Sequence, residues 1–158
     1  SLTVEGGEIS GVSSGVSNSG TVTVTVTGGI ISGSDEGVYN GQTGTLTVEG
    51  GEISGVNNGV FNYGTLYLSG APEITSKSDG YSFHLENPIT LVDALTGTGS
   101  YSACWNGDFA DGSKIVVGGK LPDGGEDYKL PSDITEKFTF DVNVELDSQE
   151  NALVVKTN

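Results

Sequence analysis

The chain is poor in the residue types that build disulfides, metal sites and basic binding surfaces. Its 158 residues contain one cysteine, Cys104, one histidine, His84, and no arginine. A single cysteine excludes an internal disulfide, and a single histidine excludes a metal site with several histidine ligands. Six basic and twenty-one acidic side chains give a net charge of −15, which repels nucleic-acid phosphates and anionic membrane surfaces. We therefore expect no nucleic-acid partner.

Long apolar runs and methionine are also missing. No stretch approaches the roughly 20 apolar residues that a membrane-spanning helix needs, so we expect no membrane insertion within this segment. Because there is no methionine, Ser1 is not a natural translation start, and we expect the chain to be a fragment of a larger protein. Any export signal would then lie outside it.

What the sequence does contain is glycine, with 26 residues, and an internal repeat. Residues 1–20 match residues 45–64 at fifteen of twenty positions, residues 23–44 repeat the pattern, and a weaker copy starts at Thr65. The repeat spans 20 to 22 residues and has no helical period. Such a pattern predicts short strands that wind into stacked turns.

Within each copy, apolar and polar residues alternate and then meet a glycine-containing turn, as in a half-buried strand. Stacked turns would place equivalent apolar residues above one another as interior ladders. The expected ladders are Leu2/Val24/Leu46/Leu66, Val4/Val26/Val48/Leu68, Ile9/Ile31/Ile53/Ile74 and Val16/Val38/Val60. Asn18, Asn40 and Asn62 recur at one position, and we expect their amides to hydrogen-bond along the stack.

After Asn87 the repeat disappears, although strand patterns continue. Further strands are expected at residues 88–91, as part of a fifth turn, and at residues 101–105 and 114–118. Residues 138–146 alternate without interruption, and a short connector joins them to a second apolar run at residues 152–156. This arrangement predicts a terminal hairpin.

The change of pattern suggests a division of the chain. We expect residues 1–95 to form the repeats and residues 96–158 to form a C-terminal antiparallel β cap. An uncapped coil would expose unpaired backbone groups and its apolar interior. The aromatic residues expected to cover that interior are Tyr101, Trp105, Phe109 and Tyr128.

The units G-x-L-T-V-x-G-G-x-I-S-G…G-V-x-N, over residues 1–95, resemble the Gly-rich repeats of parallel β-helices of the pectin-lyase-like type. They are similar in particular to repeat regions of large adhesin-like surface proteins from gut and other anaerobic bacteria. The resemblance implies a right-handed parallel β-helix of about four to five turns. Lyases, hydrolases and adhesins all use this coil, so the resemblance implies no single activity.

An enzymatic interpretation finds few suitable residues. The resemblance to polysaccharide lyases implies carboxylates that hold Ca²⁺ beside a basic residue. Glu52 and Glu73 are the pair expected on neighbouring turns, Lys77 is the first lysine, and His84 is expected at an exposed strand position. Cys104 has no histidine near it in sequence and is expected to be buried rather than nucleophilic. We therefore predict no catalytic residue, no cofactor and no enzyme.

One turn is rich in oxygen ligands. Asn106, Asp108 and Asp111 precede Gly112, in a kind of turn that Ca²⁺ favours, but their spacing does not fit an EF-hand loop. We assign no metal site, and whether these three residues hold Ca²⁺ is left open.

Two outward-facing sets of residues suggest binding surfaces. Aromatic side chains that can stack on sugar rings are Tyr39, Tyr63, Tyr67 and Tyr81. Two hydroxyl-rich columns resemble the ice-binding face of some β-solenoid antifreeze proteins: Ser1/Thr23/Thr45/Thr65 and Thr3/Thr25/Thr47/Tyr67. Threonine is also simply favoured on exposed strands.

These expectations favour a non-catalytic structural or adhesive module of a bacterial cell-surface or secreted protein, acting as a rigid spacer or binding surface. The alternatives are a carbohydrate-binding module and, less favoured, a polysaccharide lyase or hydrolase of the β-helix type. The partner would be a host or cell-wall glycan, or a protein. The location would be extracellular, with wall association through parts outside this chain.

Overall fold

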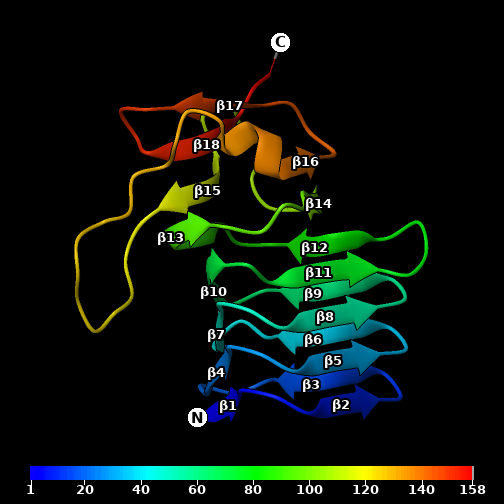
Figure 1. The fold of residues 1–158 in the computed structure, drawn as a ribbon. Helices are drawn as coiled ribbons and strands as arrows, with labels where there is room; N and C mark the ends of the chain where they lie inside the picture. Colours follow the sequence, from blue (N-terminus) through cyan, green and yellow to red (C-terminus); the bar gives the residue numbers. More distant parts are fainter. Residues whose placement is uncertain (158) are drawn as a thin grey trace.

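The computed structural model describes residues 1–157 and forms a parallel β-solenoid of about five turns (Figure 1). Each of the first four turns contributes one strand to each of three sheets. Sheet A receives β1 (Leu2–Val4), β4 (Thr23–Val26), β7 (Thr45–Val48) and β10 (Thr65–Gly70). Sheet B receives β2 (Glu8–Gly11), β5 (Ile30–Gly33), β8 (Glu52–Gly55) and β11 (Glu73–Ser76). Sheet C receives β3 (Ser14–Asn18), β6 (Glu36–Asn40), β9 (Asn58–Asn62) and β12 (Tyr81–Leu85).

The strand register confirms the predicted apolar ladders. Leu46 pairs with Val24 on one side and Leu66 on the other, and Ile31 pairs with Ile53. All five side chains are buried inside the coil. Successive strand residues point to opposite faces, so each buried residue is followed by one on the outer face. A single turn has no core of its own, because its apolar side chains are covered by the turns above and below.

The predicted asparagine ladder is also confirmed. Asn18 Nδ2 donates to Asn40 Oδ1 at 3.0 Å, and Asn40 Nδ2 donates to Asn62 Oδ1 at 2.8 Å. The amides of Asn18 and Asn62 also donate to backbone carbonyls of the segments that directly follow them, Val22 O at 2.8 Å and Gly64 O at 3.0 Å. The ladder therefore satisfies backbone acceptors at the corner where the chain leaves sheet C, without any buried charge.

The corner between sheets A and B requires glycine. Gly29 and Gly51 have φ values of 81° and 82°, in the left-handed region that residues with a Cβ rarely adopt. A Cβ at Gly29 would lie 2.9 Å from the carbonyl carbon of Gly6 in the preceding turn. The Gly-Gly pairs of the repeat therefore permit both the sharp bend and the close approach of successive turns.

Two of the three sheets continue beyond the recognisable repeat. Parallel pairing joins β13 (Ile89–Leu95) to β10, β14 (Tyr101–Trp105) to β12, β15 (Lys114–Gly118) to β13 and β16 (Phe138–Phe140) to β14. Sheet B, within residues 1–157, ends at β11. Parallel strand pairing therefore continues past residue 96, where we expected the repeats to end. In the described turns after β11, loops take the place of sheet B strands.

The expectation of one continuous strand over residues 138–146 is wrong. The chain leaves β16 in sheet C and re-enters as β17 (Val144–Asp147) in sheet A, so the uninterrupted alternation spans a corner between two sheets. The predicted hairpin is confirmed, because β17 pairs antiparallel with β18 (Ala152–Val155). Since β18 also pairs antiparallel with β15, the hairpin covers the C-terminal edge of sheet A.

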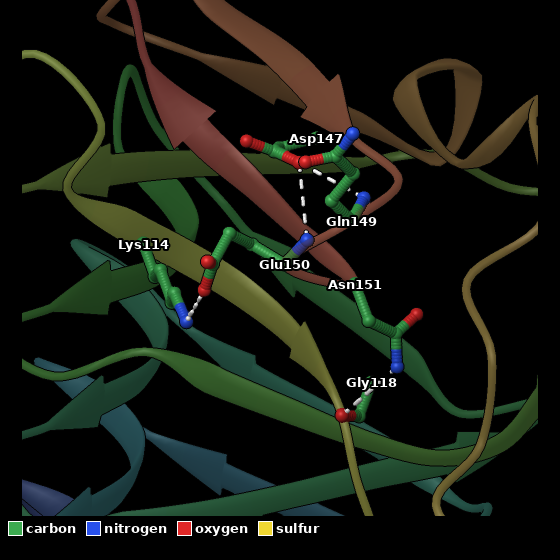
Figure 2. A network of polar contacts seen from close by, with 6 residues as sticks. All are labelled: Lys114, Gly118, Asp147, Gln149, Glu150 and Asn151. Carbon is green, nitrogen blue, oxygen red and sulfur yellow. Dashed lines mark hydrogen bonds and ion pairs between the residues drawn. The ribbon is translucent and has the colours of Figure 1, made fainter.

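Asn151 connects this hairpin to the end of β15 (Figure 2). It also connects the hairpin to the long loop that follows β15. Its side-chain nitrogen donates to Gly118 O at 3.2 Å and Tyr128 O at 2.8 Å, and its Oδ1 accepts from Leu130 N at 2.8 Å. Asn151 has φ of 50°, and asparagine tolerates this left-handed conformation better than most residues. Close by, Lys114 Nζ lies 2.6 Å from Glu150 Oε2.

The aromatic residues expected in the cap behave differently from one another. Tyr101 and Trp105 are buried, and Tyr128 packs partly buried against the core. Phe109 is 50% exposed, so its predicted role in covering the interior is wrong. Ile134, in the short helix η1 (Ile134–Lys137), is buried near the top of the coil. Within residues 1–157, no helix has the length and apolar character needed to span a membrane.

Candidate functional site

An aromatic cluster occupies the outer face of sheet C. Tyr39, Phe61 and His84 follow the buried residues of β6, β9 and β12 and therefore point outward, and they pair in register on neighbouring turns. Tyr63 follows β9, and its N–H donates to Asn40 O in the turn before. We call Tyr39, Phe61, Tyr63 and His84 the aromatic cluster. Parallel stacking assembles it from side chains about 20 residues apart in sequence.

The rings of the aromatic cluster pack against one another at different distances and angles. Phe61 and His84 stack with centroids 4.0 Å apart and an interplanar angle of 16°, and Phe61 stacks on Tyr63 at 5.1 Å. Tyr39 and Tyr63 are instead tilted relative to each other, with centroids 6.1 Å apart and planes at 57°. The stacked faces of Phe61 and His84 cover each other, whereas Tyr39 and Tyr63 are tilted relative to each other and border a common space.

That space is an open hollow of about 380 Å³. Its walls are the two tyrosines and its floor is Gly41, which carries no side chain at the position that Tyr63 occupies one turn later. The complete lining is Ser19, Tyr39, Gly41, Gln42, Thr43 and Tyr63. The volume is near the lower end of the roughly 300–1,000 Å³ range of small-molecule sites.

The sequence identified only part of this arrangement. Tyr39 and Tyr63 lie together as the sugar-stacking hypothesis requires, but Tyr67 lies in β10 of sheet A. Tyr81 starts β12, and among residues 1–157 its ring stacks on no member of the cluster. Phe61 was missed, although it follows the inward Val60 and could have been placed outward by alternation alone.

His84 is less exposed than expected. Its side chain is 23% exposed, because its ring stacks on Phe61, and its Nε2 lies 3.7 Å from Glu86 Oε1. Asn106 Nδ2 donates to the same carboxylate oxygen at 2.6 Å. His84 therefore occupies an outward-facing strand position as expected, but it is half-buried rather than exposed, and its imidazole forms one end of the aromatic cluster.

Cys104 pairs in register with His84, a proximity that sequence separation concealed. Cys104 is half-buried rather than buried as expected. This partial burial raises the pKa of its thiol to about 11, and the hydrogen bond to Asp141 and the charges of Asp141 and Glu86 act in the same direction. A nucleophilic cysteine needs the opposite shift, toward the thiolate. The neighbouring histidine therefore does not create an activated cysteine.

Apart from the neighbouring pair Glu52 and Glu73, the acidic groups considered for catalysis or Ca²⁺ binding do not converge. Glu52 in β8 and Glu73 in β11 pair in register on adjacent turns of sheet B and are both exposed. Asp108 accepts from Ala110 N, and Asp111 accepts from Thr157 N. Asn106, as described, bonds to Glu86. Within residues 1–157, no three histidine, cysteine, aspartate or glutamate side chains are grouped as a metal site would require.

The threonine columns keep their register but do not form a uniform exposed plane. Thr25 pairs with Thr3 and Thr47, and Thr47 pairs with Tyr67. Thr47 is only 6% exposed. An ice-binding plane needs regularly accessible hydroxyl groups, so this column lacks the required surface.

Comparisons of the chain with protein-family models, with curated proteins and with solved structures give no match. The parallel β-solenoid is therefore established by the strand pairing itself. The resemblance to pectin-lyase-like and adhesin-like repeats remains a prediction.

Proposed function

We propose that the chain is a rigid, non-catalytic structural or adhesive module of a bacterial cell-surface or secreted protein. The observation that carries this proposal is the continuous ladder of in-register strands and stacked asparagines along the coil. Each turn is hydrogen-bonded to its neighbours, so that bending the coil would break many contacts together. The net charge of −15 suits a protein that stays soluble outside the cell.

The non-catalytic part of the proposal is supported by the dispersion of candidate groups. Glu52 and Glu73 are exposed on sheet B, whereas His84 lies on sheet C. A glycan-cleaving site brings its acid, base and metal ligands to one place. The test is incubation with pectin, polygalacturonate and neutral plant and microbial glycans, followed by measurement of new reducing ends and unsaturated uronate. We expect neither product, and turnover of any substrate would contradict the proposal.

The mechanical part can be tested by single-molecule pulling on the two ends of the chain. We expect the coil to resist extension and then unfold in a cooperative event, because every turn depends on its neighbours. Gradual extension at low force, with turns peeling off independently, would contradict a rigid module. In the same instrument, a protein-coated tip touched to mucin or cell-wall polysaccharide measures adhesion, which the proposal expects.

A carbohydrate-binding role is the second candidate, and the tilted pair Tyr39 and Tyr63, which lines the open hollow, favours it. Exposed aromatic rings beside polar side chains are the usual means by which proteins hold small polar ligands with apolar faces. This role is compatible with the structural one, because a rigid coil would present the binding surface at a fixed position.

A further inference from the structure

The hollow between Tyr39 and Tyr63 results from two corner connections of unequal length, each of which joins a strand of sheet C to the next strand of sheet A. Four residues, 41–44, connect Asn40 to β7, whereas only Tyr63 and Gly64 connect Asn62 to β10. The backbone at the end of the shorter connection lies close to that of the longer one, since Thr65 N, at the start of β10, donates to Gly44 O at 3.0 Å. Gln42 and Thr43 are exposed and line the hollow beside the shorter connection.

Contacts within the chain position Tyr39 and Tyr63 without a ligand. Phe61 lies 6.1 Å from Tyr39 and 5.1 Å from Tyr63 between ring centroids, and it is itself stacked on His84. Asn87 Nδ2 donates to the backbone carbonyl of Tyr63 and so fixes the chain at that wall. A preformed pair of aromatic rings loses little conformational freedom on binding, which favours even a small ligand.

The polar groups around the hollow are neutral. The side chains of Ser19, Gln42 and Thr43 offer hydroxyl and amide groups that both donate and accept hydrogen bonds. Among residues 1–157, no ionisable acid or base other than the tyrosines lines the hollow. The rest of the chain carries a net charge of −15, which repels acidic ligands. A matching ligand has an apolar face for the rings, a polar rim for the amide and hydroxyls, and no negative charge.

We propose that this hollow binds a neutral hexose unit of a glycan. The apolar face of the sugar packs on Tyr39 and Tyr63, and its hydroxyl groups exchange hydrogen bonds with Gln42 and Thr43. The inference rests on the adhesive role proposed above and supplies it with a ligand class. Because the hollow is open and holds one ring, binding of a single sugar is weak, and adhesion arises from many copies on one surface.

The test is an NMR titration of the isotope-labelled chain with the methyl glycosides of glucose, galactose and mannose, and with galacturonate as the acidic counterpart of galactose. We expect at least one neutral glycoside to cause saturable shifts centred on residues 39–43 and 63, with an affinity in the millimolar range. Galacturonate should bind more weakly than methyl galactoside.

The variants separate the site from general surface effects. Tyr39→Ala should weaken binding of the neutral glycoside about tenfold or more, as truncation of a central aromatic contact does. Gln42→Ala should weaken it less, and Tyr67→Ala, which removes a tyrosine from the outer face of sheet A, should leave it unchanged. Circular dichroism and thermal unfolding verify that each variant keeps the fold.

Three results would overturn the inference: no shift at the hollow with any neutral glycoside, equal loss of affinity in Tyr39→Ala and Tyr67→Ala, or galacturonate binding at the hollow as tightly as methyl galactoside. The adhesive module itself is tested separately. If Tyr39→Ala binds no sugar but adheres to mucin or cell-wall polysaccharide like the parent chain, then the hollow is not the origin of adhesion. The module then acts through another surface.

Discussion

Asn40 lies directly above Asn18 in the coil, 22 residues later in sequence, and its Oδ1 accepts a 3.0 Å hydrogen bond from Asn18 Nδ2. Asn40 in turn donates to Asn62 and to Thr65 O. One buried amide thus joins three successive turns. Because buried polar groups are costly when unpaired, this residue should contribute to stability well beyond an exposed asparagine.

We expect Asn40→Ala to lower the free energy of unfolding by about 1–3 kcal/mol, since it leaves neighbouring amides and carbonyls without partners. Asn143→Ala, at an exposed position, is the matched control and should change stability little. Urea unfolding of both variants measures the difference. Equal stability of the two variants would show that the ladder does not join the turns energetically.

Ile30 and Ile31 provide a direct test of which face is buried. Ile31 is fully buried and Ile30 is 42% exposed, although they are adjacent in β5. Ile31→Asn should cost about 3 kcal/mol or more, because it removes an apolar contact and buries an unpaired amide. Ile30→Asn should cost well under about 1 kcal/mol.

Asparagine is the suitable replacement in this comparison, because Ile30 pairs with Glu8 and Glu52 and a carboxylate there would add repulsion. Thermal and urea unfolding measure both variants. Comparable losses at the two positions would contradict the inward and outward alternation in sheet B.

We expect the hydrogen bonds of Asn151 to hold the terminal hairpin against the loop after β15. Asn151→Ala removes three hydrogen bonds and places alanine at φ of 50°, so we expect a loss of about 2–4 kcal/mol. Asn151→Gly also loses the side-chain bonds but tolerates the backbone conformation, and its loss should be smaller.

Limited proteolysis offers a second measurement of these hydrogen bonds. In both Asn151 variants, cleavage within residues 119–131 should become faster, because Leu130 N and Tyr128 O lose their partner. Unchanged cleavage together with unchanged stability would show that the loop is held by other contacts.

The raised pKa of the Glu36 carboxyl should make the free energy of unfolding depend on pH. Burial, followed by the charge of neighbouring Asp35, raises the pKa of the Glu36 carboxyl above its ordinary value of 4.5, and its Oε2 has no hydrogen-bond partner among the described residues. With a folded pKa above the unfolded one, the folded state holds its proton more tightly. Stability is therefore lost as pH rises from 4.5 through the raised pKa.

Glu36→Gln should accordingly stabilise the fold near pH 7, with an advantage that shrinks as pH falls to 4.5 and below. Glu5→Gln, at an exposed position, controls for the general reduction of negative charge. Urea unfolding across this pH range measures both variants. A constant difference between Glu36→Gln and the parent chain would contradict a titrating Glu36.

Much of the coil could be predicted because the repeat encodes it locally. The spacing of Val24, Leu46 and Leu66 specified which residues share a ladder, and the recurrence of Asn40 and Asn62 specified the polar one. These inferences need only alternation and a fixed period. The break between Phe140 and Val144 was missed, because an alternating sequence reads the same whether it stays in one sheet or turns a corner.

The candidate site was predicted less completely. Outward tyrosines were recognised, but which of them meet depends on the corner geometry and on the lengths of two turns. Tyr67 belongs to a different sheet, and Phe61, two residues before Tyr63 in the same turn, packs against both members of the pair.

The amino-acid sequence by itself determined the period, the buried and exposed faces and the glycine corners, because these depend on residue type and on near neighbours in the chain. Only the tertiary structure decided that sheets A and C continue past the repeat, that His84 stacks on Phe61 beside Cys104, and that Tyr39 and Tyr63 line one open hollow. These features depend on how one turn is displaced over the next, which many distant contacts set together.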